Sequence, residues 1–450
     1  MNIIIMGLGS VGRALSEELA REGHNVVVVD NLSERVETAV NEFDVKGVIG
    51  NGASSDVLIE AGITSADLLI AATSNDELNI LCCIIGKKLG VDKTIARVSN
   101  TEYSSLFSDG GELGLSLMVN PQYEAAMEIS RMLRFPSAIK VDQFSEGKVE
   151  LVEFRVPSDS PLAGIPLKKL GEHFNMKVLI CAAQRNNQAI IPSGEFVIQA
   201  EDRLFLTATT KNISLFFKQL GWNKQSKNVL IVGGSKTAFY LCQNLAKIGI
   251  AAKIIEKNES KAQALSQDLT KTEIIHGDGT DQKLLYDEGI TSADAFVALG
   301  DIDEQNIIIS MVAASINVPK VITKIDQLSY YDMLQKRGIY SAISSKTSTV
   351  TQIVRFIRSI ANKDGSVVKR LFRIIDDNAE ILEFEAESNF KKFDIPLQSL
   401  NLKRNLLIAG IIRNEILITP SGQDVIKEGD SVIVVTLEEG LDDLNDILNA

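Results

Sequence analysis

The fold is decided by the opening stretch Ile3-Ile4-Ile5-Met6-Gly7-Leu8-Gly9-Ser10-Val11-Gly12. An apolar run leads into a Gly-x-Gly-x-x-Gly loop, and an amphipathic helical pattern follows. This order is typical of a dinucleotide-binding βαβ unit, because the glycines permit a tight turn, close approach of a pyrophosphate and close helix packing. Asp30 ends the next apolar run, at about the 20-residue separation expected for a carboxylate that binds ribose hydroxyls. We predict that this loop and Asp30 bind a nucleotide.

The kind of nucleotide is only partly determined by these residues. Glycines alone are compatible with a plain strand-to-helix turn, but strand, helix and acid together favour a binding site. A carboxylate at position 30 would repel a 2′-phosphate, which argues against NADP. It does not distinguish NAD from ATP, ADP or AMP, since all of them present a free ribose diol.

The chain repeats itself. Gly62-Ile63-Thr64-Ser65-Ala66-Asp67 recurs residue for residue as Gly289-Ile290-Thr291-Ser292-Ala293-Asp294. A weaker echo follows in each half, where Ile165-Pro166-Leu167 matches Ile395-Pro396-Leu397. The 450 residues, enough for about two to four domains, therefore divide into two copies of a two-part unit.

Each copy is predicted to be α/β, with a larger and a smaller part. The larger part alternates short β-branched runs with helical stretches, which indicates a Rossmann-like, doubly wound parallel sheet. The smaller part has short strands and one helix, typical of a small α+β module. The predicted domains are 1–119 (first Rossmann-like), 120–139 (linking helix), 140–221 (first α+β), 222–227 (linker), 228–344 (second Rossmann-like), 345–368 (second linking helix) and 369–450 (second α+β).

The two linking helices have a basic and apolar composition that is unusual in this acidic chain. The first is predicted to begin at Asn120 as N-cap, with Pro121 in the first turn. Its segment Ile129-x-Arg131-Met132-Leu133-Arg134 matches Ile353-x-Arg355-Phe356-Ile357-Arg358 in the second. Each helix either packs on its own domain or crosses to another subunit, and spacing does not distinguish the two.

The second copy departs from the first at its glycine loop, Gly233-Gly234-Ser235-Lys236-Thr237-Ala238. Ser235 replaces the middle glycine, Ala238 stands at the position that tolerates alanine, and Glu256 keeps the ribose carboxylate. Because a serine Cβ would crowd a pyrophosphate, the second loop is either a working site of altered affinity or a structural remnant.

Further polar residues follow later strands, at the sheet edge where ligands bind in open α/β folds. Arg97 and Lys324 are interpreted as phosphate contacts, with a surface charge as the alternative. Asp76-Glu77 and Asp303-Glu304 are interpreted as favourable acids in a first helical turn. The predicted ligand contacts are Gly7, Leu8, Gly9, Ser10, Val11, Gly12, Asp30, Asn51, Gly52, Thr73, Ser74 and Arg97 in the first copy, and Gly233, Gly234, Ser235, Lys236, Thr237, Glu256, Asp278, Gly279, Gly300 and Lys324 in the second.

Composition argues against several classes of function. The net charge of −13 opposes binding to nucleic acid and to anionic lipid. No apolar stretch approaches the roughly 20 residues of a spanning helix, and the N-terminus reads as a strand rather than a signal peptide, so we expect a cytoplasmic protein. Four cysteines without C-x-x-C spacing and three scattered histidines predict reduced core cysteines and no metal site.

The sequence shows no recognisable set of catalytic residues. A hydride-transfer enzyme needs an acid or base beside the nicotinamide and a substrate pocket, and the sequence offers no such constellation. An NAD-dependent oxidoreductase with a small-molecule substrate is therefore the alternative to a non-enzymatic nucleotide-binding protein. A structural scaffold with inactive nucleotide sites is a third class.

The tandem order of parts resembles the TrkA family of bacterial potassium uptake regulators, whose members contain two regulator-of-K⁺-conductance (RCK) units. The resemblance covers essentially the whole chain. It rests on the opening glycine stretch, Ala71-Ala72-Thr73-Ser74-Asn75-Asp76-Glu77-x-Asn79, Ile95-Ala96-Arg97 and the closing Val425-Ile426-x-x-Gly429-Asp430-x-Val432. In the first small module Glu201-Asp202 replaces the usual Gly-Asp turn.

The resemblance implies a peripheral subunit on the cytoplasmic face of the inner membrane. Such subunits assemble into a ring, here expected as a homotetramer or a dimer of dimers, beneath an integral membrane potassium-translocating subunit of the TrkH/TrkG type. They gate that partner on binding NAD(H), ATP or ADP. By position, the resemblance places the first site at Gly7 to Val11, Asp30, Thr73, Ser74 and Arg97, and the second at Gly233 to Thr237, Glu256 and Lys324.

Overall fold

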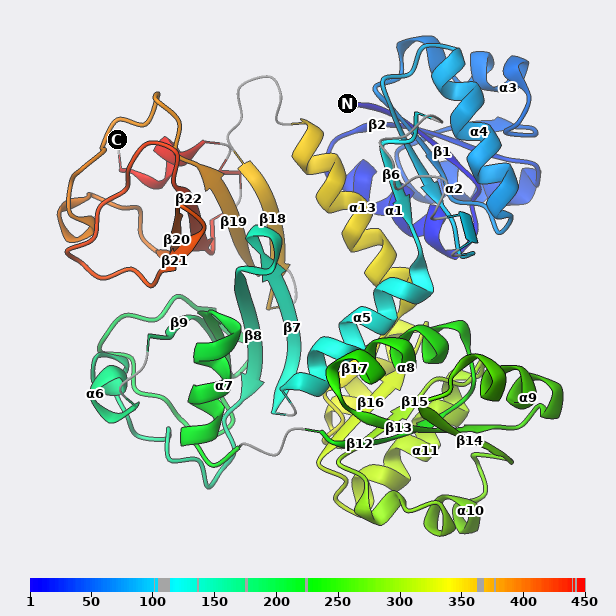
Figure 1. Cartoon of the computed structure of the whole chain (residues 1–450). Coiled ribbons are helices and arrows are strands. Elements are labelled where there is room, and N and C mark those ends of the chain that lie inside the picture. Colours follow the sequence, from blue (N-terminus) through cyan, green and yellow to red (C-terminus); the bar gives the residue numbers. More distant parts are fainter. Residues whose placement is uncertain are drawn as a thin grey trace.

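The computed structural model describes residues 1–100, 102–103, 114–135, 137–174, 177–222, 226–361, 368–375, 378–438, 440–441 and 443–449. These residues form four sheets, in which a six-stranded parallel sheet and a five-stranded antiparallel sheet alternate twice along the chain (Figure 1). The predicted fold class is confirmed: two tandem repeats, each a Rossmann-like sheet followed by a small α+β module. Within the described ranges no helix is both long and apolar enough to span a membrane.

The first parallel sheet has the strand order β3-β2-β1-β4-β5-β6. Its strands are β1 (Asn2–Met6), β2 (Asn25–Asp30), β3 (Lys46–Ile49), β4 (Leu68–Ala71), β5 (Lys93–Arg97) and β6 (Leu117–Val119). Its helices are α1 (Ser10–Arg21), α2 (Ser33–Glu42), α3 (Ser55–Glu60) and α4 (Asp76–Lys88). The chain order reverses between β1 and β4, and in open α/β sheets such a switch point is where ligands bind.

The second parallel sheet repeats this order as β14-β13-β12-β15-β16-β17. Its strands are β12 (Asn228–Val232), β13 (Ala251–Glu256), β14 (Thr272–His276), β15 (Ala295–Ala298), β16 (Lys320–Lys324) and β17 (Ser341–Ile343). Its helices are α8 (Lys236–Ile248), α9 (Glu259–Asp268), α10 (Gln282–Asp287), α11 (Asp303–Ser315) and α12 (Tyr331–Gln335). The switch point recurs between β12 and β15.

The two antiparallel sheets hold the small modules. The first contains β7 (Ala138–Phe144), β8 (Val149–Arg155), β9 (Leu179–Arg185), β10 (Gln188–Ile190), β11 (Arg203–Ala208), α6 (Leu170–Phe174) and α7 (Thr210–Gln219). The second contains β18 (Val368–Ile374), β19 (Ala379–Glu385), β20 (Leu406–Arg413), β21 (Ile416–Ile418) and β22 (Ser431–Thr436). The two sheets share an apolar cluster in which the Phe144 and Phe372 rings lie 4.3 Å apart, so the small modules form one packed body.

The first small module and the linking helix before it each differ from the sequence prediction. The module has two helices instead of one, because α7 also forms there. Thr209 is its N-cap and accepts a hydrogen bond from Asn212 N–H, and the helix buries Ile213, Phe216 and Phe217. The predicted linking helix 120–139 is also shorter, since α5 (Pro121–Arg134) is followed by β7 from Ala138. Within the predicted linker 222–227, residues 223–225 lie outside the described residues, as do residues 362–367 of the predicted helix 345–368.

The linking helices α5 and α13 (Ser345–Ala361) are exchanged between the two halves (Figure 1). On α5, Ile129 and Leu133 belong to the apolar cluster of the second parallel sheet, together with Leu241 of α8. On α13, Ile353 and Ile357 belong to the cluster of the first. The two interpretations of the sequence, packing on the helix's own domain or crossing to another subunit, are both replaced by a crossing within one chain.

The four cysteines are free and buried, as the sequence predicts. Burial raises the pKa of the Cys82, Cys181 and Cys242 thiols to about 12. Thiols in this state are inert core residues rather than nucleophiles.

Candidate functional site

The first glycine loop lies at the switch point between β1 and β4. Gly7 has a φ of +90°, in the left-handed region, and a Cβ there would lie 2.8 Å from Thr73 Cγ2. A Cβ on Gly12 would lie 1.8 Å from the Gly7 carbonyl oxygen. The fold itself therefore requires glycine at both positions, one for backbone conformation and one for helix packing.

Gly9 is different, because the surrounding protein does not require a glycine there. Its φ is −70°, and a Cβ at this position would meet nothing within 4 Å. The open space lies at the N-terminus of α1, where backbone N–H groups and the helix dipole favour an anion. The free space beside Gly9, at a helix N-terminus, is suited to a bound pyrophosphate.

Asp30 lies next to this loop, at the end of β2, with a side chain only 5% exposed. Its Oδ2 accepts a hydrogen bond from the Leu8 N–H at 2.7 Å, and its Oδ1 accepts one from Leu32 N–H at 3.0 Å. The Arg35 guanidinium lies 3.7 Å away. Backbone donors thus hold the carboxylate beside the loop. The sequence predicts at this position a carboxylate that binds ribose hydroxyls.

Thr73 and Arg97 extend the same sheet edge from β4 and β5. Arg97 donates a hydrogen bond to the Thr73 carbonyl at 2.8 Å, and its Nε is buried without a partner. Burial lowers the pKa of Arg97, and the nearby charge of Asp76 partly offsets this. The structure brings Gly7, Thr73 and Arg97 together and leaves Ser74 exposed beside them.

Asn51 and Gly52, which follow β3, have local structural roles. The Asn51 side chain accepts a hydrogen bond from Ala53 N–H at 3.0 Å. A Cβ on Gly52 would lie 1.5 Å from Met6 Cε, so this glycine is needed for packing under β1. Among the remaining predicted contacts, Leu8 and Val11 are buried and Ser10 is exposed at the start of α1.

Sequence reasoning assigned no role to Asn79, which the structure places at the centre of this edge. The side chain is fully buried on α4. Its Oδ1 accepts hydrogen bonds from Thr73 N–H and Oγ1, and its Nδ2 donates to the Thr73 and Arg97 carbonyls. Asn306 bridges Gly300 and Lys324 in the same way in the second copy. The repeated Asp-Glu-x-Asn motif was the signal that could have indicated both residues.

Asp76 also has a larger role than the favourable first-turn acid that the sequence suggested. Its Oδ2 accepts hydrogen bonds from the Ser99 and Asn100 N–H groups, both at 2.9 Å. Asp303 makes the equivalent contacts with the N–H groups of Asp326 and Gln327. These acids therefore tie the chain leaving β5 or β16 to the preceding helix.

The second copy forms its own cavity of about 200 Å³ at the corresponding sheet edge. Glu256 repeats the geometry of Asp30: its Oε2 accepts a hydrogen bond from Gly234 N–H at 2.7 Å, and its Oε1 from Asn258 N–H at 2.7 Å. The cavity is lined by Gly233, Gly234, Ser235, Glu256, Asp278, Gly279 and Gly300 from the predicted set, and by Lys257 and Lys261, which were not predicted.

Ser235 takes up a capping role in place of the middle glycine. Its hydroxyl accepts a hydrogen bond from Ala238 N–H at 3.3 Å, which makes it the N-cap of α8. Lys236 is exposed and Thr237 is buried behind it. A side chain that occupies the helix N-terminus leaves less room for a pyrophosphate than Gly9 does.

The cations of the second cavity are not the ones that the sequence indicated. Lys257 Nζ lies 2.6 Å from Asp278 Oδ2, and this contact lowers the pKa of Asp278 to about 2. Lys261 Nζ lies 3.7 Å from Glu256. Lys324 instead faces Asp326 at 3.8 Å and is not one of the residues lining the cavity. In the described ranges, no cluster of three or more His, Cys, Asp or Glu residues is arranged to hold a metal ion.

Comparison with known proteins gives matches along nearly the whole chain. The TrkA-N domain family matches residues 3–121 and 229–345, and the TrkA-C domain family matches 151–221 and 381–449. The Trk system potassium uptake protein TrkA of Haemophilus influenzae is 30% identical over 444 residues, which cover 96% of this chain and 95% of that protein. The protein of the same name from Vibrio alginolyticus is 31% identical over 441 residues, covering 96% and 95%.

Solved structures show the same fold at lower sequence identity. The GsuK RCK domain has a TM-score of 0.64 and 16% identity, covering 96% of this chain and 92% of that one. The GsuK channel bound to NAD also has a TM-score of 0.64 and 16% identity, covering 97% and 76%. At this identity the likeness concerns the fold alone.

Proposed function

The chain belongs to the TrkA family, with tandem TrkA-N and TrkA-C domains, and from this premise we propose that it is a cytosolic, nucleotide-binding regulatory subunit of a potassium uptake system. It gates an integral membrane potassium-translocating subunit of the TrkH/TrkG type in response to NAD(H), ATP or ADP. The observation that carries the proposal is the pairing of a glycine loop with a buried carboxylate at the switch point of both parallel sheets.

The first site consists of the loop from Gly7 to Gly12 with Asp30, Thr73 and Arg97 around it. The open position at Gly9 and the N-terminus of α1 receive the pyrophosphate, and Asp30 receives the ribose hydroxyls. The second site consists of the loop from Gly233 to Thr237 with Glu256. Its Ser235 cap and its Lys257 and Lys261 side chains favour a mononucleotide polyphosphate over a dinucleotide.

Family membership supports a regulator over the alternative NAD-dependent oxidoreductase. The relatives at about 30% identity are named as potassium uptake proteins. A protein of the same fold, GsuK, has been solved with NAD and with ADP bound, and both ligands match the classes that Asp30 admits.

Regulation follows from differential binding. A nucleotide shifts the chain between two arrangements only as far as its affinities for them differ. The exchanged helices α5 and α13 connect each parallel sheet with the small modules, so a change at a switch point reaches the rest of the chain through them.

Several chains form a ring, as a homotetramer or a dimer of dimers. Because the net charge of −13 opposes contact with anionic lipid, the ring attaches through its protein partner.

Calorimetry with NADH and ATP on the wild type, Asp30→Ala and Glu256→Ala tests the sites. A hydrogen bond to a charged group contributes about 1.5–3 kcal/mol, so each variant should lose about 10- to 100-fold in affinity at its own site. Asp44→Ala is the matched control, because it removes an exposed carboxylate beyond the sites.

Potassium flux into vesicles that contain the membrane partner tests the gating. Nucleotide should change the flux only when the chain is present, and Asp30→Ala or Glu256→Ala should weaken the response. A wild type that binds neither nucleotide, or flux that ignores both nucleotide and chain, would overturn the proposal.

A further inference from the structure

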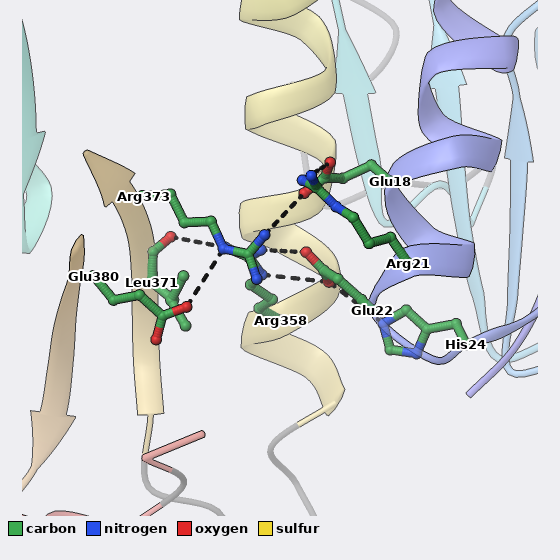
Figure 2. A network of polar contacts seen from close by, with 8 residues as sticks. All are labelled: Glu18, Arg21, Glu22, His24, Arg358, Leu371, Arg373 and Glu380. Carbon is green, nitrogen blue, oxygen red and sulfur yellow. Dashed lines mark hydrogen bonds and ion pairs between the residues drawn. The ribbon is translucent and has the colours of Figure 1, made fainter. Parts of the chain in front are cut away.

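A network of charged side chains joins the first parallel sheet domain to the second small module (Figure 2). The carboxyl end of α1 and the residues after it supply Glu18, Arg21, Glu22 and His24 (Figure 2). Helix α13 supplies Arg358, and the strands β18 and β19 supply Arg373 and Glu380. The region around the end of α1 therefore meets, at one polar contact, the segment from α13 to β19, which is far from it in the sequence.

Arg358 is the centre of the network. Its Nη2 pairs with Glu22 Oε1, its Nε donates to Glu22 Oε2 at 3.4 Å, and its Nη1 donates to the Leu371 carbonyl of β18 at 3.2 Å. The side chains of Arg358 and Glu22 are only 16% and 11% exposed. A fork-to-fork pair of this kind, largely removed from water, is stronger and more directional than a surface ion pair.

Two further acids reinforce the contact. Arg373 lies with its Nη1 3.9 Å from Glu18 and its Nε 3.4 Å from Glu380.

Burial alone would raise the pKa of Glu22, but hydrogen bonds with His24 and Arg358 hold this pKa below its usual value. Glu22 is therefore a carboxylate at neutral pH, and removing Arg358 would leave a largely buried charge with less compensation.

Among the described residues, the second half has no ion pair at the place equivalent to Glu22–Arg358. The repeat puts Asn244 and Ile248 of α8 where α1 has Glu18 and the following turn has Glu22. The polar link there is neutral, from Asn244 Nδ2 to Ser130 Oγ of α5 at 2.6 Å. Arg134, the counterpart of Arg358, instead pairs at 3.3 Å with Glu150 of the small module that follows it.

We propose that the pairs Glu22–Arg358 and Glu18–Arg373, named here the α1 latch, couple the first nucleotide site to the second small module, and that α8, the counterpart of α1, has no such ion pair among the described residues. The coupling role rests on the proposed function. Helix α1 begins at the glycine loop and ends at the latch, about 18 Å away at 1.5 Å per residue. A displacement of its N-terminus by a bound phosphate is therefore transmitted to Arg358 by one rigid element.

Packing along α1 favours this transmission over a local adjustment. Leu15 and Leu19 of α1 share a cluster of fully buried side chains with Ile353 and Ile357 of α13. Close-packed interfaces shift between discrete arrangements instead of deforming continuously. The latch then fixes which arrangement of β18 accompanies each arrangement of α1.

The first arm of the test uses no nucleotide. Hydrogen exchange of the full chain is compared for wild type, Glu22→Gln, Arg358→Gln and the charge-swapped pair Glu22→Arg with Arg358→Glu. The single variants should speed exchange in β18 and at the carboxyl end of α1 about tenfold, and the swap should recover part of this. Asn244→Ala is the matched control and should leave both segments unchanged. Exchange in β18 at the wild-type rate in Arg358→Gln would overturn the latch.

The second arm adds NADH or ATP to the Glu256→Ala chain, in which the first site is the intact one. Nucleotide should alter exchange in β18, and adding Arg358→Gln should abolish that change while affinity stays within about threefold. A full nucleotide response in β18 without Arg358 would overturn the coupling role. If no nucleotide bound the wild type, the proposed function and the coupling would both fall, while the first arm would still decide whether the latch holds the domains together.

Discussion

Lys320 gives the most specific stability prediction, because its amine is buried at an interface between domains. Among the described residues it hydrogen-bonds to a carbonyl and a hydroxyl and not to a carboxylate. The residue begins β16 and is 4% exposed. Its Nζ donates to the Ala138 carbonyl of β7 and to Ser341 Oγ at 2.7 Å, and Ser341 in turn donates to the Ile139 carbonyl at 3.1 Å. These bonds join the second parallel sheet to the first small module.

Burial lowers the pKa of Lys320 from 10.5 to about 7, and the charge of Glu153 only partly opposes this. The difference corresponds to about 5 kcal/mol between the charged and neutral forms. Between pH 7 and 10.5 the unfolded chain holds a proton on Lys320 that the folded chain has lost. The free energy of unfolding therefore rises with pH in this window, and below it both states are protonated and this contribution is constant.

Replacing Lys320 by Met removes the titrating group and retains most of the side-chain volume. From pH 6 to 9 the wild type should gain about 2–3 kcal/mol of unfolding free energy relative to Lys320→Met. Urea titrations of both proteins at four pH values measure the difference, in which the contributions of all other groups cancel. Lys93→Met is the matched control, since Lys93 begins β5 with a side chain 28% exposed and 3.6 Å from Asp92. Parallel pH profiles for the wild type and Lys320→Met would refute the reasoning.

Two substitutions in the first site give further stability predictions. Gly12→Ala places a methyl group 1.8 Å from the Gly7 carbonyl position and should cost about 1–3 kcal/mol in urea denaturation, whereas the reverse change Ala238→Gly in the second copy should cost about 1 kcal/mol or less. Equal losses of unfolding free energy for Gly12→Ala and Ala238→Gly would show that the loop around Gly7 accommodates the methyl group without strain. Asn79→Ala leaves the backbone groups of two strand ends without their buried partner and should cost about 3 kcal/mol, against about 1 kcal/mol for loss of the N-cap in Asn75→Ala. Thermal unfolding measures both, and a smaller loss for Asn79→Ala would contradict the bridging role.

The features that the sequence predicted correctly are local ones. The parallel sheets follow from apolar runs alternating with helical patterns, and the N-cap at Asn120 follows from one side chain and its neighbours, since its Oδ1 accepts from Gln122 and Tyr123 N–H. Asp30 lies at the loop because the ends of adjacent parallel strands meet at one edge. Each of these depends on residues that are close in the sequence or on strands that are neighbours in one sheet.

The features that the sequence did not reveal depend on the direction in which side chains point and on contacts between residues far apart in the chain. The apolar face of α5 shows that something must cover it, but not that α8 does so. Lys324 is the last residue of β16 and Lys257 directly follows β13, and only the fold shows that Lys257 lines the cavity while Lys324 faces Asp326. The role of Asn79 likewise requires β5 to lie beside β4.

The exchange of α5 and α13 makes the two halves interdependent in a way that a plain tandem repeat is not. Each parallel sheet buries a helix that belongs to the other half, so neither parallel-sheet domain is completely packed without the other. On the proposed function, a ligand at one site therefore acts on a shared core. The contacts beyond that core are unequal. The first parallel-sheet domain contacts the second small module through Glu22 and Arg358, whereas the second parallel-sheet domain contacts the first small module through the buried amine of Lys320. On the proposed function we therefore expect the two sites, which share one core but have unlike connections to the small modules, to have unequal effects on the chain.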